Sequence, residues 1–161
     1  MATAPYETTS AAGTTISIVG GDPATFDATG FAALVWVPIG KIKNAGEFGK
    51  TFQLITNNYL SQRGDEKRKG TFNAGQLNLD VDIKTDLGQA ACETALDSDA
   101  DHNFKIAFKN GLTYYVRGQV VSFSKKIGGP NDMVAASIGI ELNPFFASGT
   151  ELAAVKVEPS A

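Results

Sequence analysis

The sequence predicts a mainly β protein: an antiparallel β-sandwich or barrel with one short flanking α-helix and a long charged hairpin loop. Three observations support this fold class. Apolar and polar residues alternate with the period of a strand in several segments, most clearly over residues 72–84. Clusters of Gly, Pro, Asn and Asp separate these segments as turns. Only the segment that begins at Asp86 has the cap and spacing of a helix.

Composition sets limits on the class of protein. The 161 residues suffice for one domain with its own core, and 14 basic against 17 acidic residues leave a mild negative charge that argues against a general nucleic-acid-binding surface. One cysteine (Cys92) excludes an internal disulfide, and together with the one histidine (His102) it cannot form a usual zinc site. No secretory signal or bilayer-spanning apolar stretch is visible, so we expect synthesis in a cytoplasm.

The N-terminal part is expected to hold an arm and two strands. Residues 1–13 are rich in Ala, Thr and Ser without periodicity, which indicates a flexible arm. A strand is predicted over residues 14–19, ended by the turn formers of residues 20–23. A second strand is predicted over residues 31–43. Within it, Pro38 indicates an edge, a bulge or a strand end, because proline lacks the amide that a strand ladder needs.

A long hairpin is predicted next. The strand-like residues 51–57 are followed by the charged run of residues 63–70 and then by the strand of residues 72–84. This order of a strand, a charged loop and a strand predicts a hairpin arm that contacts other copies of the chain. The apolar residues of the last strand form its buried face, and its wet face comprises Gln76, Asn78, Asp80 and Asp82.

The predicted helix follows this strand directly. The side chain of Asp86 can accept a hydrogen bond from the amide near Gln89, and Gln89 can reach back, as in a capping box. The helix is expected to end near Asp97 and to lie on a sheet through a narrow stripe of small residues. The stripe and its flanking residues are Leu87, Ala91, Ala95, Cys92 and Leu96.

The C-terminal part predicts three further strands. Residues 104–109 alternate and are followed by Asn110-Gly111, the strongest short-range hairpin signal. The returning strand, residues 112–124, is long and only roughly alternating, so it is expected to bend or to pair with two neighbours. A last strand is predicted over residues 134–142. The domain is thus expected to span residues 14–143, before a mostly irregular C-terminal tail of residues 144–161.

The sequence nominates no catalytic residue. Asp97, Asp99 and Asp101 alternate as in calcium loops, but His102 and Phe108 stand where the EF-hand pattern needs Gly and Glu, so at most weak calcium binding is expected. His102 has no serine, cysteine or second histidine in a known arrangement, which favours a surface histidine over a general base. No phosphate-binding glycine loop is present, and we expect no cofactor and no metal.

The basic stretch Lys67-Arg68-Lys69 has two interpretations on residue type alone. It is either a solvated hairpin tip or a contact with an acidic surface of a neighbouring copy, and both stay open. Binding to the phosphates of nucleic acid is disfavoured, because a few cations without stacking aromatic residues make a poor nucleic-acid-binding site.

The order of the segments carries a resemblance to a known family. The strand of residues 52–57 is followed by a charged arm through Arg63 and Arg68, then by Gly70-Thr71-Phe72, the strand of residues 77–82 and the helix capped by Asp86. In this order the chain resembles the tail tube proteins of long-tailed bacteriophages (siphophages), which are related in fold to type VI secretion tube proteins. The resemblance covers residues 31 to 142.

The resemblance implies a structural virion protein that is not an enzyme and that is made in the host cytoplasm. Subunits would form hexameric rings that stack into the phage tail tube, a hollow conduit for genome ejection. The implied partners are other copies of the chain, the tape measure protein and DNA, which pass through the lumen without sequence-specific binding, and the tail-tip and tail-terminator proteins. No membrane is implied.

The resemblance also implies roles for residues. Gln76, Asn78, Asp80 and Asp82 would face the lumen, where an acidic lining repels phosphate, and neighbouring copies would pair the sheet edges. The charged arm would contact the next subunit or ring through Tyr59, Leu60, Arg63, Lys67, Arg68 and Lys69. The alternative is a monomeric β-sandwich binding module, such as a decoration or adhesin domain, which predicts a concave ligand pocket and a stable monomer.

Overall fold

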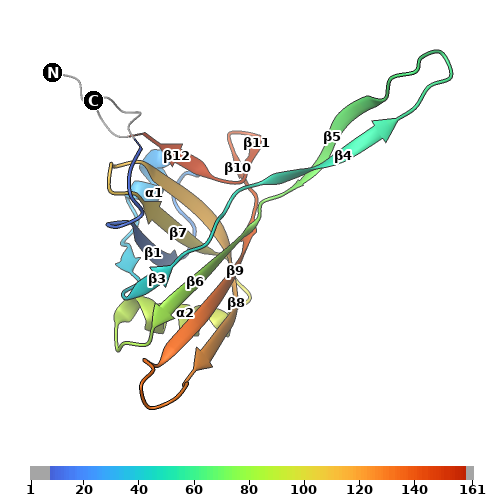
Figure 1. Cartoon of the computed structure of the whole chain (residues 1–161). Coiled ribbons are helices and arrows are strands. Elements are labelled where there is room, and N and C mark those ends of the chain that lie inside the picture. Colours follow the sequence, from blue (N-terminus) through green and yellow to red (C-terminus); the bar gives the residue numbers. More distant parts are fainter. Residues whose placement is uncertain (1–7, 159–161) are drawn as a thin grey trace.

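A computed structural model describes residues 8–158 and has a curled antiparallel sheet at its centre (Figure 1). The predicted mainly β fold of sandwich or barrel type is therefore confirmed. No helix in the described residues is both long and apolar enough to cross a membrane. The strands of the sheet, in spatial order, are β2 (Val37–Pro38), β1 (Thr15–Gly20), β7 (His102–Ala107), β8 (Thr113–Lys126), β9 (Ala135–Asn143), β6 (Gln76–Asp82) and β3 (Ile42–Asn44), with β12 (Val155–Val157) also beside β8.

One short segment belongs to both edges of this sheet. β2 pairs with β1 at one edge, and β3, only three residues further along the chain, pairs with β6 at the other. The connection bonds to both sides, because Ile39 N donates to Ile16 O at 2.8 Å and Asp82 N donates to Lys41 O at 3.0 Å. The two edges are thereby brought together, and the sheet curls around a core.

The core confirms the alternation predicted for the β6 strand. Leu77, Leu79 and Val81 are buried, whereas the residues between them face outward. Strands β1, β7 and β9 bury alternate residues against the same core. Because the other face of the sheet is in water, apolar and polar residues alternate along the sequence with a period of two. The largest fully buried aliphatic side chains of this core are Ile16, Ile18, Leu77, Leu79, Ile106, Ile138 and Ile140.

Strand β8 is irregular for a visible reason. Its register against β9 shifts between Val120 and Ser122, and the extra residue, Val121, is exposed. The bulge changes which residues face the core: Val120 does so before it and Phe123 after it. On one side β8 pairs with β12 at its start and with β9 along the rest, so the prediction that this strand bends or serves two neighbours is confirmed.

Helix α2 (Leu87–Leu96) begins where the sequence predicts. Asp86 Oδ1 accepts from Gly88 N at 2.6 Å and from Gln89 N at 3.0 Å. The predicted capping box is only half formed, because Gln89 does not return to Asp86. Its Nε2 donates instead to the carbonyl oxygens of Gly40 and Asp82, and its Oε1 accepts from Lys84 N. The helix start is therefore tied to the β2–β3 connection and to the end of β6.

The buried face of α2 differs from the predicted stripe. Gly88, Gln89, Cys92 and Ala95 are buried, whereas Leu87 is 79% exposed. The difference follows from close packing at the helix start, since a Cβ at Gly88 would overlap the Pro38 carbonyl oxygen. Only glycine lets the helix approach the β2–β3 connection so closely, and this contact sets the rotation of the helix.

The strand predicted over residues 31–43 is wrong for residues 31–36, but Val37 and Pro38 form β2 and β3 begins at Ile42. Pro38 ends an edge strand, as predicted. The first two residues of the predicted strand belong to a short helix, α1 (Ala28–Ala32), whose start is capped by Asp27 through a 2.8 Å bond from Gly30 N. The helical turn places Phe31 in an aromatic cluster on the outer face of β8, where its ring stacks on Tyr115 and meets Phe145 edge-on. Burial of three aromatic side chains outweighs the strand preference of an apolar run.

The C-terminal residues are more regular than predicted. A small hairpin forms from β10 (Phe145–Ala147) and β11 (Thr150–Leu152), and β12 adds to the main sheet. The hairpin turns at Ser148 and Gly149, which both have positive φ (51° and 81°). The expectation of a mostly irregular tail is therefore wrong for residues 145–157. Residues 1–7 of the predicted N-terminal arm and residues 159–161 lie outside the described residues.

The tight approach at Gly88 gives a prediction for stability. Gly88→Ala should lower the free energy of unfolding by about 1–3 kcal/mol, because the new methyl group collides with backbone that cannot move away easily. Urea denaturation followed by circular dichroism measures the change. Gly64→Ala is the matched control, since Gly64 faces open space, and its effect should stay within about 0.5 kcal/mol. Equal stability of both variants would contradict the packing described.

Candidate functional site

The charged hairpin projects from the barrel as a two-stranded ribbon, here called the arm (Figure 1). It consists of β4 (Thr51–Asn57), β5 (Glu66–Asn73) and the tip loop of residues 58–65. The hairpin is present as predicted, but β4 pairs with β5 and not with β6, and the basic stretch lies in β5 and not in a loop. A turn separates β5 from β6, where Asn73 Oδ1 accepts from Gly75 N at 2.8 Å and Gly75 has a φ of 95°.

The basic residues of the arm have no ionic partner within residues 8–158. Lys67, Arg68 and Lys69 stand opposite Thr56, Ile55 and Leu54, and every residue of β4 is exposed. Among the described residues, no ion pair within 4.0 Å includes these three cations or Arg63. Lys69 Nζ does lie 5.0 Å from the centroid of the Phe52 ring. The cationic groups are therefore left for solvent or for another molecule.

The arm also exposes apolar side chains. Leu54, Ile55, Tyr59 and Leu60 are all exposed, and Leu60 is fully so. The predicted contact residues thus fall in two places: Tyr59, Leu60 and Arg63 in the tip loop, and the basic stretch on β5. A two-stranded ribbon with both faces in water is marginally stable by itself, so packing against another surface would stabilise it.

The predicted polar face of β6 is exposed on the outside of the sheet. Gln76, Asn78 and Asp80 point to solvent, and Asp82 is partly covered. Strand β9 extends this face, because Glu141 stands opposite Gln76 and Ser137 stands opposite Asp80, to which its Oγ donates at 3.0 Å. Sequence reasoning named only the buried residues of β9. The same period of two would have identified Ser137 and Glu141.

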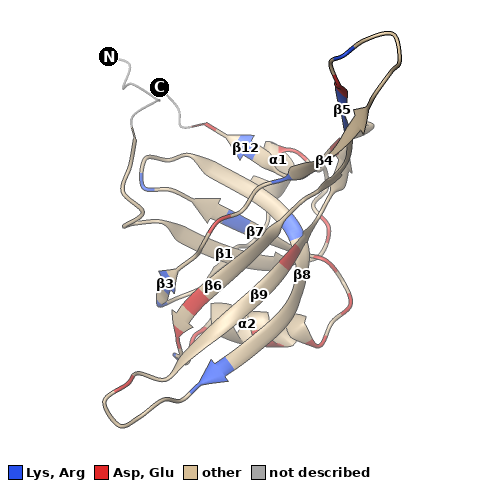
Figure 2. Cartoon of the chain, turned by 45° about the vertical axis from the view of Figure 1, so that its right-hand side comes forward, with Lys and Arg blue, Asp and Glu red and all other residues tan. Residues whose placement is uncertain are grey.

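The charge on this face is mixed at one end. Asp80, Asp82 and Glu141 are acidic, but Lys43 Nζ lies 3.2 Å from Asp82 Oδ1, and Lys126 ends β8 on the same side of the sheet. Figure 2 shows acidic segments on β6 and β9 and a basic segment at the far end of β8. Lys43 is more than half exposed, so its pair with Asp82 contributes little stability.

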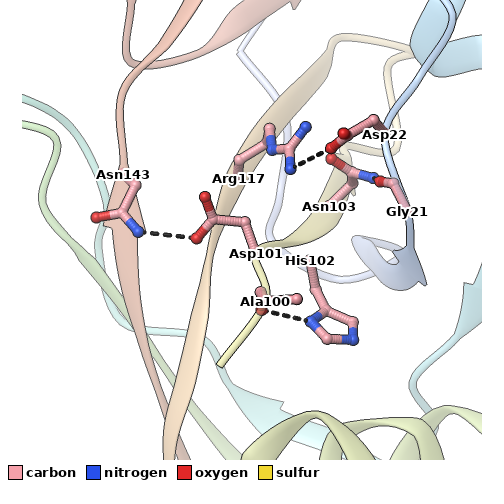
Figure 3. A network of polar contacts seen from close by, with 8 residues as sticks. All are labelled: Gly21, Asp22, Ala100, Asp101, His102, Asn103, Arg117 and Asn143. Carbon is pink, nitrogen blue, oxygen red and sulfur yellow. Dashed lines mark hydrogen bonds and ion pairs between the residues drawn. The ribbon is translucent and has the colours of Figure 1, made fainter. Parts of the chain in front are cut away.

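The acidic run before β7 ties a loop to the sheet. Asp101 Oδ1 accepts from Asn143 Nδ2 at 2.9 Å, and His102 Nδ1 lies 3.1 Å from Ala100 O (Figure 3). The backbone oxygen of Asp99 accepts from Gln119 Nε2 at 2.7 Å. Within residues 8–158, no group of three or more His, Cys, Asp or Glu side chains is arranged to hold a metal ion.

A buried arginine that sequence reasoning missed anchors the loop after β1. Arg117 on β8 is 7% exposed, and its Nη2 donates to Asp22 Oδ1 at 2.8 Å (Figure 3). Its guanidinium also lies 5.0 Å from the centroid of the Phe26 ring. Opposite it on β7, the buried Asn103 donates to Gly21 O at 2.7 Å. No local pattern signals this pair, because Asp22 and Arg117 lie 95 residues apart.

The thiol of Cys92 is not a reactive nucleophile. It lies fully buried against the core, and burial, with a smaller contribution from the negative charge of Asp86, raises its pKa to about 12. The thiol is therefore protonated at neutral pH, and only the thiolate is a good nucleophile.

An apolar hollow of about 420 Å³ opens at the end of the barrel where the arm begins. Beside it lies a second hollow of about 510 Å³ between β6 and the segment of residues 46–51. The first is lined mainly by apolar side chains, including the core residues Val116 and Leu142, so it is the open mouth of the core.

Comparison with solved structures shows where this fold occurs. A chain in the cryo-EM structure of the anti-feeding prophage (AFP) baseplate matches with a TM-score of 0.64 and 9% sequence identity, over 85% of this chain and 94% of that one. A chain in the cryo-EM structure of an extracellular contractile injection system, the PVC sheath/tube terminator in the extended state, matches with a TM-score of 0.61 and 14% identity, over 87% of this chain and 96% of that one.

A chain in the PVC sheath-tube complex matches with a TM-score of 0.57 and 9% identity, over 91% of this chain and 88% of that one. No protein-family model and no curated protein sequence matches the chain. At these identities the likeness establishes a shared fold, and it covers nearly the whole of each chain.

The buried arginine gives a prediction. Asp22→Ala should lower the free energy of unfolding by about 1–3 kcal/mol, because the buried guanidinium loses its carboxylate acceptor. Thermal and urea unfolding measure this change. Asp99→Ala is the control, because its exposed carboxylate takes part in no ion pair among the described residues, and it should change stability by less than about 0.5 kcal/mol. A neutral Asp22→Ala would show that the pair does not hold the loop.

Proposed function

We propose that this chain is a structural subunit of a phage-type tail tube. Copies form hexameric rings, the rings stack, and the stack encloses a hollow conduit through which the genome leaves the virion. The chain is not an enzyme in this proposal, and it resides in the virion tail after synthesis in the host cytoplasm. Its partners are other copies of itself, the tape measure protein and DNA inside the lumen, and the tail-tip and tail-terminator proteins at the ends.

The arm is the observation that carries this proposal. It extends away from the barrel, exposes the whole of β4 and holds cations without ionic partners among the described residues. Within the part of the chain that the structure describes, no residue of β4 is buried. A surface of this kind is completed by another molecule, and the net charge of -3 supplies acidic partners on other copies.

The fold supports the same proposal. The three similar chains come from a baseplate, a sheath/tube terminator and a sheath-tube complex, which are multi-subunit assemblies. The exposed polar face of β6 suits an inner wall, because Asp80, Asp82 and Glu141 would repel the phosphates of passing DNA. In the proposed tube this face, with Gln76 and Asn78, lines the lumen.

Two other functions have an observation in their favour. Two of the similar chains come from an extracellular contractile injection system, which favours a subunit of a contractile particle. Imaging the native particle for an outer sheath decides this. A monomeric binding module, such as a decoration or adhesin domain, is favoured by the apolar hollow. It predicts a stable monomer at every concentration.

Electron microscopy of the concentrated protein tests the proposed function. We expect rings or tubes, with or without a tail-tip initiator, and a reconstruction in which Asp80 and Glu141 line the lumen. A monodisperse monomer under every condition would contradict self-assembly. Tubes whose β6 face points outward would contradict the assigned lining alone.

The cations of the arm give a sharper prediction. Replacing Lys67, Arg68 and Lys69 together by Glu should abolish tube growth, because three attractive contacts per copy become repulsive. Sedimentation and electron microscopy measure the loss, while circular dichroism should show an unchanged fold, since these side chains are exposed. Replacing Lys105, Lys109 and Lys156 by Glu reverses the same number of charges outside the arm and is the control. Normal growth of the arm variant would exclude its cations as contacts.

A further inference from the structure

Three of the large exposed apolar side chains outside the arm, Ile127, Met133 and Val134, lie at the tip of the hairpin that joins β8 and β9. We propose that the β8–β9 hairpin of one copy inserts its tip into the hollow of the next copy along the stack. This contact rests on the proposed self-assembly and adds a second joint between successive copies, independent of the arm.

The hollow is a ready site for apolar side chains. It lies where β8 begins, where β9 ends and where the arm leaves the barrel, so it opens at one end of the molecule. Filling it would extend the hydrophobic core across the joint. Its apolar lining includes Phe48, Tyr114, Val116, Leu142 and Leu152.

The hairpin tip, residues 127–134, offers such side chains at the other end. Ile127 is 73% exposed and Met133 74%, and Val134 beside them is 46% exposed. The tip is held in shape, because Asp132 Oδ2 accepts from Gly129 N at 2.9 Å and Asp132 N donates to Gly129 O at 3.1 Å. The 14 residues of β8 separate the tip from the hollow by roughly 40 Å of strand, so one copy cannot fill its own hollow.

Charge and symmetry favour the tip as the occupant. In the proposed contact, Asp132 on the tip would face Lys50, which lines the hollow, and Lys126 beside the tip would face Glu47, which lines the adjoining hollow. A contact between two different ends of the same molecule is heterologous, and it repeats from copy to copy without closing on itself. Such a contact produces a stack.

The tip of the arm is the competing occupant, and its position argues against it. The arm leaves the barrel at the same end as the hollow (Figure 1). If all copies stack in the same orientation, the hollow of one copy faces the opposite, rear end of the next copy. The arm starts at the hollow end and extends along the next copy, so its tip does not lie opposite a hollow. The hairpin tip lies at that rear end.

Photo-crosslinking within assembled tubes tests the contact. A photoreactive benzoylphenylalanine at position 133 should crosslink to Phe48, Tyr114 or Leu152 of another copy, as mapped by mass spectrometry. The same group at position 35 is the control, because Val35 is 82% exposed and lies outside both the tip and the hollow lining. Crosslinks from position 133 to the arm or to any other surface would overturn the inference while leaving self-assembly intact.

Substitution gives a second readout. Ile127→Asp and Met133→Asp should each raise the protein concentration needed for tube formation roughly tenfold or more, because each removes a buried apolar side chain from the joint. Val35→Asp should leave that concentration unchanged within about twofold. Unchanged assembly of both tip variants would overturn the inference. If the unaltered chain forms no assemblies at all, the proposed function fails and this contact fails with it.

Discussion

The structure depends on how the curled sheet is closed at Gly40. This residue lies in the one connection that belongs to both sheet edges, and the start of helix α2 holds both of its backbone groups. Gly40 N donates to Asp86 Oδ2 at 3.0 Å, and Gln89 Nε2 donates to Gly40 O at the same distance. A buried amide that satisfies three backbone groups at once makes the junction specific in geometry, since each would be costly to leave unpaired.

The curled sheet leaves several surfaces of the molecule incomplete. The arm, the hairpin tip and the apolar hollow all expose apolar groups that the rest of the described residues leave uncovered. These surfaces lie at the two ends of the strands, whereas the polar face of β6 and β9 runs between them. A molecule that exposes apolar groups at both ends and a polar face between them can stack end to end. The fold that it shares with chains of a baseplate, a terminator and a sheath-tube complex fits this interpretation.

Local signals explain which features could be predicted from sequence. The alternation of β6, the cap at Asp86 and the hairpin at Asn110-Gly111 each depend on neighbours in the chain, and each is found where expected. Features set by distant contacts were missed. Phe31 turns into a helix because Tyr115 and Phe145 surround it, and Gln89 leaves the capping box for Gly40, which lies 49 residues away.

The candidate site follows the same division. The polar face of β6 was predictable because its opposite face is buried, which imposes a period of two. The strand β5 had no such period, since both faces of the arm are exposed, and its basic stretch therefore resembled a loop. The buried pair of Arg117 and Asp22 needed the fold itself, because charge at these positions carries no local pattern.

Hydrogen exchange of the arm amides, measured for the free subunit and again after assembly, tests most directly whether other copies complete the arm. The amides of β4 and β5 should exchange fast in the free subunit, because a ribbon exposed on both faces opens readily, and should become strongly protected in assembled material. Amides in the core strands β6 and β9 should be protected in both states. An arm with the same exchange rates before and after assembly would contradict the account.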